Sequence, residues 1–143
     1  MSTRKALGDE LAMAMQEVIA SAVLTNERIA RSVGLNVVDF QTYGVLLRSG
    51  APMTPGQVSQ ATELPSSTTT RVLDRLEAKG MVERRPDPSD RRKVQVQALQ
   101  FYDKNVEDAY AEIVRQLGEV HAGFTVAELE IALRYLRAIK DVR

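Results

Sequence analysis

Residues 64–99, LPSSTTTRVLDRLEAKGMVERRPDPSDRRKVQVQAL, set the organisation of this chain, because they join a helix to a basic hairpin without a spare residue. The apolar spacing from residue 66 predicts a helix whose buried face is made of Thr69, Val72, Leu73 and Leu76. The opposite face carries small hydroxyls and arginines, the side chains that contact base edges and phosphates in a major groove. The candidate residues of this helix are Ser66, Ser67, Thr68, Thr70, Arg71 and Arg75.

A hairpin follows this helix directly. Gly80 stands where a left-handed residue commonly ends a helix, and Lys79 lies in the last turn. Residues 81–85 and 93–98 are predicted strands, because valine and glutamine alternate in the second of them. The intervening PDPSD contains two prolines and the Asp and Ser side chains that favour a stiff turn.

Basic residues surround the turn of the hairpin, and Arg84 belongs to the same cluster. A narrow ribbon tipped with arginine can enter a minor groove, where the electrostatic potential of DNA is most negative. A solvated surface hairpin is the alternative interpretation, but its position after the hydroxyl-rich helix favours nucleic acid. The candidate residues of the hairpin are Arg85, Asp90, Arg91, Arg92 and Lys93.

The composition is that of a globular protein. Its 143 residues are 44% hydrophobic and 27% charged, which predicts a single domain over residues 1–143. The absence of cysteine excludes a disulfide frame and thiolate chemistry. No apolar run reaches the roughly 18 residues of a membrane span, and residues 1–10 lack the apolar core of a signal peptide. We therefore expect a cytoplasmic protein with no membrane partner.

The net charge is zero but it is unevenly distributed along the chain. Residues 65–93 carry eight basic and five acidic side chains, whereas residues 1–64 carry five and six, and residues 94–143 carry six and eight. Local charge sets the footprint on a polyanion, so this positive segment supports a nucleic-acid partner. Because the positive excess is modest, we expect affinity to depend on two copies of the chain.

The residues before this segment predict the first half of a helix-turn-helix. Asn36 is a good N-cap for a helix over residues 38–48, and Thr54 with Gln57 forms a capping box that opens a short helix. The short helix and the hydroxyl-rich helix are joined by a tight turn, which is the helix-turn-helix pattern. The hairpin makes the pattern winged, so residues 36–98 are the predicted DNA-binding part.

Long amphipathic helices flank this part on both sides. A broad apolar band runs along residues 7–32, and apolar residues recur at helical spacing over residues 99–122. Thr125 begins a second capping box that opens the last helix. Because a winged helix needs neither outer part, we expect residues 5–33 and 99–143 to build a twofold dimer interface.

The sequence offers no residue set for enzymatic chemistry. The single histidine, His121, cannot form a triad, and one imidazole without cysteine is not a transition-metal site. The glycines stand singly, at positions typical of helix ends, and do not form the glycine-rich motif of a phosphate-binding loop. We predict no catalytic residue, no metal and no cofactor. A ligand pocket stays open, although core packing explains each aromatic candidate: Phe40, Tyr43, Tyr102 and Tyr110.

Residues 53–96 resemble the helix-turn-helix and wing of the MarR family of bacterial transcription regulators. The most specific match is Asp90-x-Arg92 within the segment DPSDRR. The framework matches at Arg71, Leu73, Asp74, Arg75, Leu76, Glu77, Gly80, Val82 and Arg85. Specific residues match over this segment. In the outer helices only the order and length of the predicted elements are similar.

This resemblance implies a homodimer with six helices per subunit and a two-stranded wing. The second helix of the helix-turn-helix would read the major groove of a palindrome, and Arg92, oriented by Asp90, would enter the minor groove. Many members are repressors that small, often aromatic and anionic, ligands release. The predicted fold class is therefore mainly α with a small two-stranded antiparallel wing, a winged helix-turn-helix plus N- and C-terminal dimerisation helices.

Two positions depart from the family pattern. Pro65 stands where a serine N-cap is frequent, so Ser66 is expected to cap the helix, and Ala98-Leu99 replaces a common Leu-Thr before the next helix. The predicted function is a sequence-specific, double-stranded DNA-binding transcriptional regulator, a homodimeric repressor with a small-molecule effector as a further partner. The alternative is a winged helix used for protein contact without a specific operator.

Overall fold

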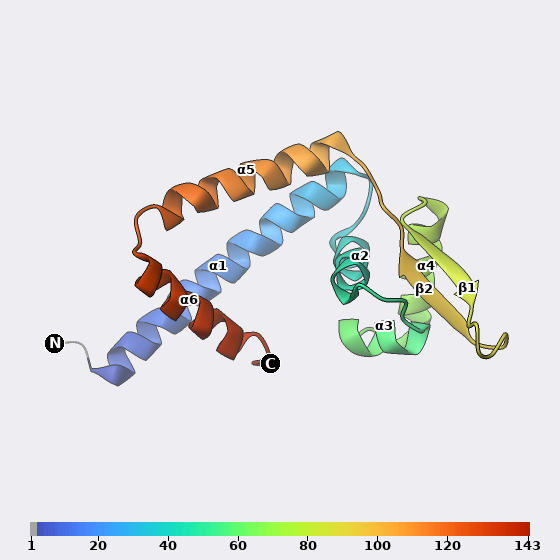
Figure 1. The fold of residues 1–143 in the computed structure, drawn as a ribbon, viewed down its shortest axis with the longest axis horizontal. Coiled ribbons are helices and arrows are strands. Elements are labelled where there is room, and N and C mark those ends of the chain that lie inside the picture. The colour runs from blue at the N-terminus through green and yellow to red at the C-terminus, as the bar shows by residue number, and fades with distance from the viewer. Residues whose placement is uncertain (1–2) are drawn as a thin grey trace. The chain divides into compact units, whose positions relative to one another are not determined.

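The computed structural model describes residues 3–143, which form six helices and a two-stranded antiparallel wing (Figure 1). Their bounds are α1 Arg4–Ser32, α2 Val37–Ser49, α3 Pro55–Thr62, α4 Ser66–Ala78, β1 Val82–Pro86, β2 Val94–Ala98, α5 Lys104–His121 and α6 Val126–Ile139. The predicted mainly α fold with a small two-stranded antiparallel wing is confirmed. Contacts divide the chain into a unit that ends at Asp103 and a second unit, Lys104–Arg143.

Polar side chains cap the first two helices. Thr3 Oγ1 accepts a hydrogen bond from the backbone N–H of Ala6 at 3.1 Å, so α1 begins before the predicted Leu7. Asn36 caps α2 as predicted, because its Oδ1 accepts from the backbone N–H of Asp39 at 2.8 Å. Helix α2 extends one residue beyond the predicted range at each end.

The helix-turn-helix has one predicted cap and lacks another. Thr54 Oγ1 accepts from the Gln57 N–H at 3.1 Å, and Gln57 Oε1 accepts from the Thr54 N–H at 2.9 Å, so the capping box is confirmed. The predicted cap of α4 by Ser66 is wrong. The carbonyl of Pro65 already accepts from the Thr69 N–H at 2.9 Å, which makes Ser66 the first helical residue instead of the cap.

The core of the first unit lies where α2, α3 and α4 meet the sheet. Its large, fully buried apolar side chains are Leu73, Leu76, Met81, Val58, Val72, Val82 and Val96. The predicted buried face of α4 is confirmed, since each of its four residues is at most 1% exposed. Burial of one such aliphatic side chain stabilises the fold by roughly 1.5–3 kcal/mol, so this core holds α4 with its other face outward.

The wing follows α4 through a single left-handed glycine. Gly80 has a φ of 72° and turns the chain from α4 into β1, as the sequence predicts. Strands β1 and β2 pair with Arg84 opposite Val96. On the other edge of β2, Val96 exchanges two backbone hydrogen bonds with Met53, at 2.7 and 2.9 Å. The base of the wing is therefore tied to the segment before α3.

Helix α5 begins later than the sequence predicts. Residues 99–103 are not helical, so the prediction of a helix from Leu99 is wrong. The Leu99 N–H donates to the Met81 carbonyl at 2.8 Å, and the Leu99 carbonyl accepts from the Tyr43 hydroxyl at 2.8 Å. Both backbone groups of Leu99 are thus satisfied outside a helix, and α5 starts only at Lys104.

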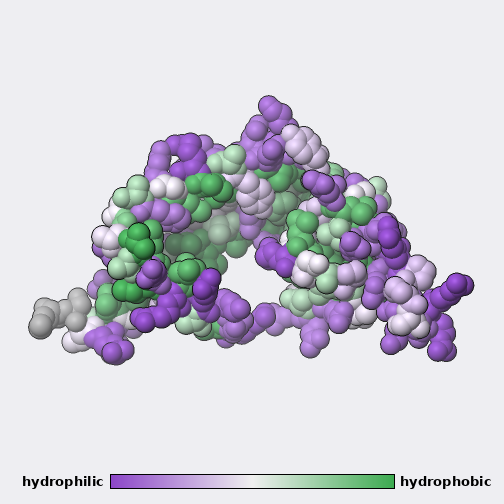
Figure 2. Space-filling model, in the orientation of Figure 1, coloured by the Kyte–Doolittle hydropathy of each residue, from purple (hydrophilic) through white to green (hydrophobic). Residues whose placement is uncertain are grey.

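The outer helices carry many apolar side chains at the surface (Figure 2). Helices α5 and α6 have no buried residue, and α1 buries only Ile29 and Ala30. Thr125 caps α6 by accepting from the Glu128 N–H at 3.2 Å, while the Glu128 carboxylate accepts from the Thr125 hydroxyl instead of completing the predicted box. No helix within residues 3–143 combines the length and hydropathy needed to cross a bilayer.

Candidate nucleic-acid interface

Helix α4 presents its hydroxyl-bearing side to solvent. Ser66, Ser67, Thr70 and Arg71 are exposed, and Thr68 is half-buried. Because no side chain caps the helix, the backbone N–H groups of its first turn stay available. A helix N-terminus with available N–H groups favours a phosphate. The first turns of α4 therefore offer backbone and hydroxyl donors together.

Arg75 joins α4 to α2. Its Nε and Nη2 donate to the two carboxylate oxygens of Asp39, each at 2.8 Å. The side chain of Asp39 is 2% exposed, whereas that of Arg75 is 47% exposed. These hydrogen bonds raise the pKa of the Arg75 guanidinium above its ordinary value. The sequence predicts Arg75 as a DNA contact, but the structure places its guanidinium on a buried carboxylate.

Arg71 differs from Arg75 in its partners. Within residues 3–143 its side chain forms no ion pair and no hydrogen bond. Both arginines lie on α4 four residues apart, so the sequence pattern alone does not separate them. Asp39 is not predicted from the sequence either, because an acidic residue in the first turn of a helix is ordinary. The role of Asp39 depends on the burial of its side chain, and no pattern in the neighbouring sequence predicts that burial.

Arg84 of β1 lies against α4. Its Nη2 donates to Asp74 Oδ1 at 2.8 Å, and its Nη1 donates to Glu77 Oε1 at 3.2 Å. The sequence pattern places Arg84 in the basic cluster of the hairpin but not among the candidate site residues. Strand alternation is the signal that finds it, because Arg84 shares a face with the buried Val82.

Hydrogen bonds within the wing tip fix its turn. Asp87 Oδ1 accepts from the Ser89 N–H at 2.8 Å and from its hydroxyl at 2.6 Å, and Asp87 Oδ2 accepts from Gln95 Nε2 at 3.1 Å. The Ser89 bonds lower the pKa of the Asp87 carboxyl below its ordinary value. Asp90 Oδ1 accepts from the Arg92 N–H at 3.0 Å and from its Nε at 3.3 Å. The tip is therefore ordered by its own carboxylates.

The predicted wing cations differ in position and in their ion pairs. Arg92 is 92% exposed, and Arg91 and Lys93 are exposed beside it. Arg85 lies on β1 and pairs with Glu83 at 2.8 Å. The structure therefore brings Arg91, Arg92 and Lys93 together at the tip and leaves Arg85 on the strand.

Replacement of Asp87 with alanine is expected to loosen the wing tip. The Ser89 amide loses its acceptor, so its protection from hydrogen exchange should fall in Asp87→Ala and stay unchanged in the control Asp108→Ala on α5. The folded pKa of Asp87 is lowered, so the wild-type bonds are present above the ordinary carboxyl value and are lost as pH falls through the lowered pKa. Equal Ser89 protection in both variants would contradict this account.

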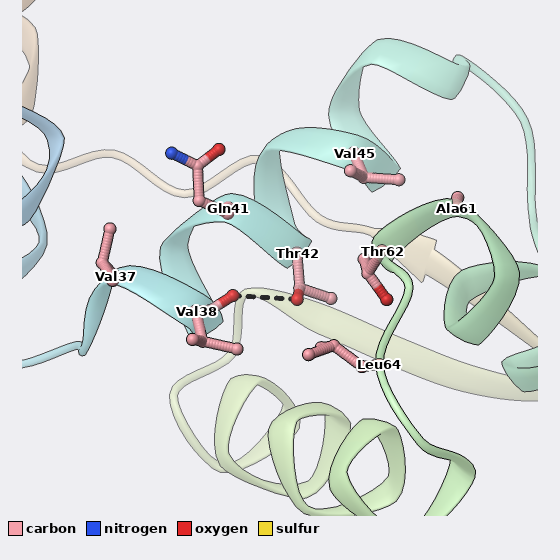
Figure 3. A pocket seen from close by; sticks show the side chains of 8 residues that line it. All are labelled: Val37, Val38, Gln41, Thr42, Val45, Ala61, Thr62 and Leu64. Carbon is pink, nitrogen blue, oxygen red and sulfur yellow. Dashed lines mark hydrogen bonds between the residues drawn. The ribbon is translucent and has the colours of Figure 1, made fainter. Parts of the chain in front are cut away.

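A depression of about 290 Å³ lies between α2, α3 and the turn before α4 (Figure 3). Its lining residues are Val37, Val38, Gln41, Thr42, Val45, Ala61, Thr62 and Leu64. The hydroxyls of Thr42 and Thr62 donate to backbone carbonyls of their own helices, at 2.9 and 2.7 Å. None of the four aromatic candidates lines this depression, and none of its lining residues carries a charge that an anionic ligand needs.

No metal site is formed by the described part of the chain. Residues 3–143 contain no group of three His, Cys, Asp or Glu side chains arranged to hold an ion. His121 is exposed at the end of α5. On the same helix Arg115 pairs with Glu112 and Glu119, each at 2.6 Å, and its hydrogen bonds lower the pKa of Glu112 to about 2. These carboxylates serve ion pairs of the helix surface.

A helix-turn-helix followed directly by a two-stranded wing, with hydroxyls and cations exposed on both, defines a winged helix-turn-helix DNA-binding protein. The family model that matches this chain is that of the MarR family, over residues 33–93. This is a family of transcriptional regulators. The resemblance of the wing and its preceding helices is thereby confirmed.

Relatives extend this likeness over nearly the whole chain. The chain is 29% identical to the uncharacterised HTH-type transcriptional regulator YcgE of Bacillus subtilis, over 99% of this chain and 94% of that protein. A solved MarR family protein from Bacillus stearothermophilus is 25% identical, with a TM-score of 0.74 and 96% of each chain covered. The fold is also that of a mutant E. coli MarR complexed with operator DNA, at 22% identity, a TM-score of 0.60, and 97% and 99% coverage.

Proposed function

We propose that this regulator is a homodimeric repressor that binds a palindromic operator, with α4 in the major groove and the wing in the adjacent minor groove. One observation carries the proposal: Arg71 on α4 has no partner within residues 3–143, and Arg92 at the wing tip is almost fully exposed. Both belong to the unit that ends at Asp103. The solved E. coli relative in complex with operator DNA supports the same use of the fold.

Apolar surface supports the dimer. Val114, Leu117 and Val120 of α5 are all about half exposed or more, as are Ile131 and Leu136 of α6. Soluble monomers rarely expose contiguous apolar faces of this kind, and twofold pairing is the common way to bury them. A dimer presents two copies of α4, so the proposed operator has two half-sites about one helical turn apart.

Repression follows from occupancy, because a dimer bound over a promoter excludes other proteins from the same DNA. The proposal places this action in the cytoplasm. It also includes release by a small-molecule effector, which the family resemblance implies. The uncharged lining of the depression beside α2 and α3 favours a site elsewhere for an anionic effector.

Selection of bound duplexes from a random-sequence library tests the proposal. We expect a palindrome to emerge, and its affinity to fall steeply between low and high salt as counterions are released. Titrations of the selected duplex and of scrambled DNA at two salt concentrations measure the sequence preference. Micromolar binding that ignores sequence, together with a stoichiometric protein partner, would instead support a winged helix used for protein contact.

Arg92→Ala is expected to weaken binding to the selected duplex by about tenfold, the effect of one lost groove contact. A narrow, A·T-rich minor groove attracts an inserted arginine, so the flanking A·T preference should also disappear when the selection is repeated with the variant. Arg48→Ala on α2 removes the same charge from an exposed position without a proposed role. Equal affinities of the two variants would exclude Arg92 as a DNA contact.

A further inference from the structure

Arg84 connects β1, the first strand of the wing, to α4 by several hydrogen bonds. Its guanidinium donates to Asp74 at 2.8 Å, to Glu77 at 3.2 Å and to the carbonyl of Thr70 at 3.4 Å. The side chain of Arg84 is only 24% exposed. Several acceptors that share one planar guanidinium form a network, which holds its geometry better than a single exposed ion pair. This cluster is therefore a rigid joint between β1 and α4.

The backbone of Arg84 takes part in the same joint. Val96, the partner of Arg84 across the sheet, directs both of its backbone groups to Met53. In an antiparallel ladder the residue opposite such a position points its N–H away from the sheet. The Arg84 N–H accordingly donates to Glu77 Oε2 at 3.2 Å. One carboxylate thus holds both the backbone and the side chain of one strand residue.

The joint also offsets part of the acidic charge on α4, the helix proposed to face DNA. Asp74 lies three residues beyond Arg71, and its side chain is 61% exposed, while that of Glu77 is 44% exposed. Carboxylates at such positions repel phosphates unless a cation accompanies them. Arg84 supplies this cation from the wing and leaves one net negative charge in place of two, which reduces the repulsion between α4 and a phosphate.

We propose that Arg84 is a positioning residue for DNA binding, which fixes the wing relative to α4 and so sets the separation between the contacts of Arg71 and Arg92 along the duplex. This inference rests on the proposed function. It assigns Asp74 and Glu77 the role of anchors for the wing rather than of contacts to bases. A wing released from these anchors would still carry Arg92, but no longer at one fixed distance from α4.

Arg84→Met tests the inference, because methionine keeps the length of the stem and removes the hydrogen bonds. We expect the affinity for the selected duplex to fall about tenfold or more. At a protein concentration that restores occupancy, protection of guanine N7 in the major groove should return. Protection of the minor groove from hydroxyl radicals at the wing position should stay weak or spread over several nucleotides. A loss of folding alone would reduce both protections together.

Two further variants separate positioning from charge. Arg48→Met makes the same substitution on α2, outside the joint, and should leave both protections and the affinity unchanged. The triple variant Asp74→Asn, Glu77→Gln and Arg84→Met removes the guanidinium of the joint and also the two carboxylates that Arg84→Met alone would leave without a cation. If Arg84 positions the wing, the triple variant keeps the weak minor-groove protection.

The outcomes of this experiment separate the inference from the proposed function. Absence of any protection by the wild-type protein would end the proposed function itself. Wild-type binding with an unchanged footprint and affinity in Arg84→Met would overturn only the inference. Full recovery of affinity and footprint in the triple variant would also overturn it, because Arg84 would then act by charge alone.

Discussion

Arg75→Met should lower the free energy of unfolding by about 3 kcal/mol, the lower end of the range for stranding a buried charge. The variant leaves the Asp39 carboxylate 2% exposed and without the guanidinium that now donates two hydrogen bonds to it. Some water can enter through the position that Arg75 vacates, since its side chain is 47% exposed. Denaturant titration of the two proteins measures the difference.

The opposite single variant is expected to cost much less. Asp39→Asn leaves Arg75, which can be hydrated because its side chain is half exposed, so the loss should be about 1 kcal/mol. The double variant Asp39→Asn with Arg75→Met removes the stranded charge and should regain most of the stability lost in Arg75→Met. Equal losses in the two single variants would show that the carboxylate is not the costly partner.

The same pair of arginines shows where sequence reasoning ends. Arg71 and Arg75 both lie on α4, and sequence spacing gives them the same expected role. They differ because Asp39, far away in the sequence, lies beside only one of them. The link of Arg84 to Asp74 is non-local in the same way. A pairing between residues distant in the sequence produces no recognisable sequence pattern. The pairing of Arg92 with Asp90 does produce one, because the two residues are only two positions apart.

Local signals predicted the elements of the first unit well. Asn36 and Thr54 cap their helices, and Gly80 turns α4 into the wing, because each of these features depends on a few neighbouring residues. The start of α5 was mispredicted because Leu99 is held by Met81 and Tyr43, which are distant in the sequence. Tertiary hydrogen bonds there override a helical pattern.

The apolar faces of the outer helices mark a further limit. Their spacing predicts burial, but not whether the burying surface belongs to the same chain or to a second copy. In the structure Leu117 and Val120 of α5 remain about half exposed. Identical copies are the commonest source of a complementary surface, since a twofold axis brings the same face to itself. The proposed dimer is therefore testable at a single position.

Leu117→Glu should dissociate the dimer and weaken operator binding by about a hundredfold or more, because two linked contacts become two separate ones. Leu117 lies near the middle of the apolar face of α5 by helical spacing and is 48% exposed, so a carboxylate there would be buried only in the dimer. Sedimentation at several concentrations measures the mass, and titration of the selected duplex measures the affinity. Ala111→Glu adds the same charge on the polar side of α5, near Arg115, and should leave both unchanged. A Leu117→Glu protein that stays dimeric would place the interface elsewhere, and one that becomes monomeric yet binds the operator normally would show that one copy of α4 and its wing suffices.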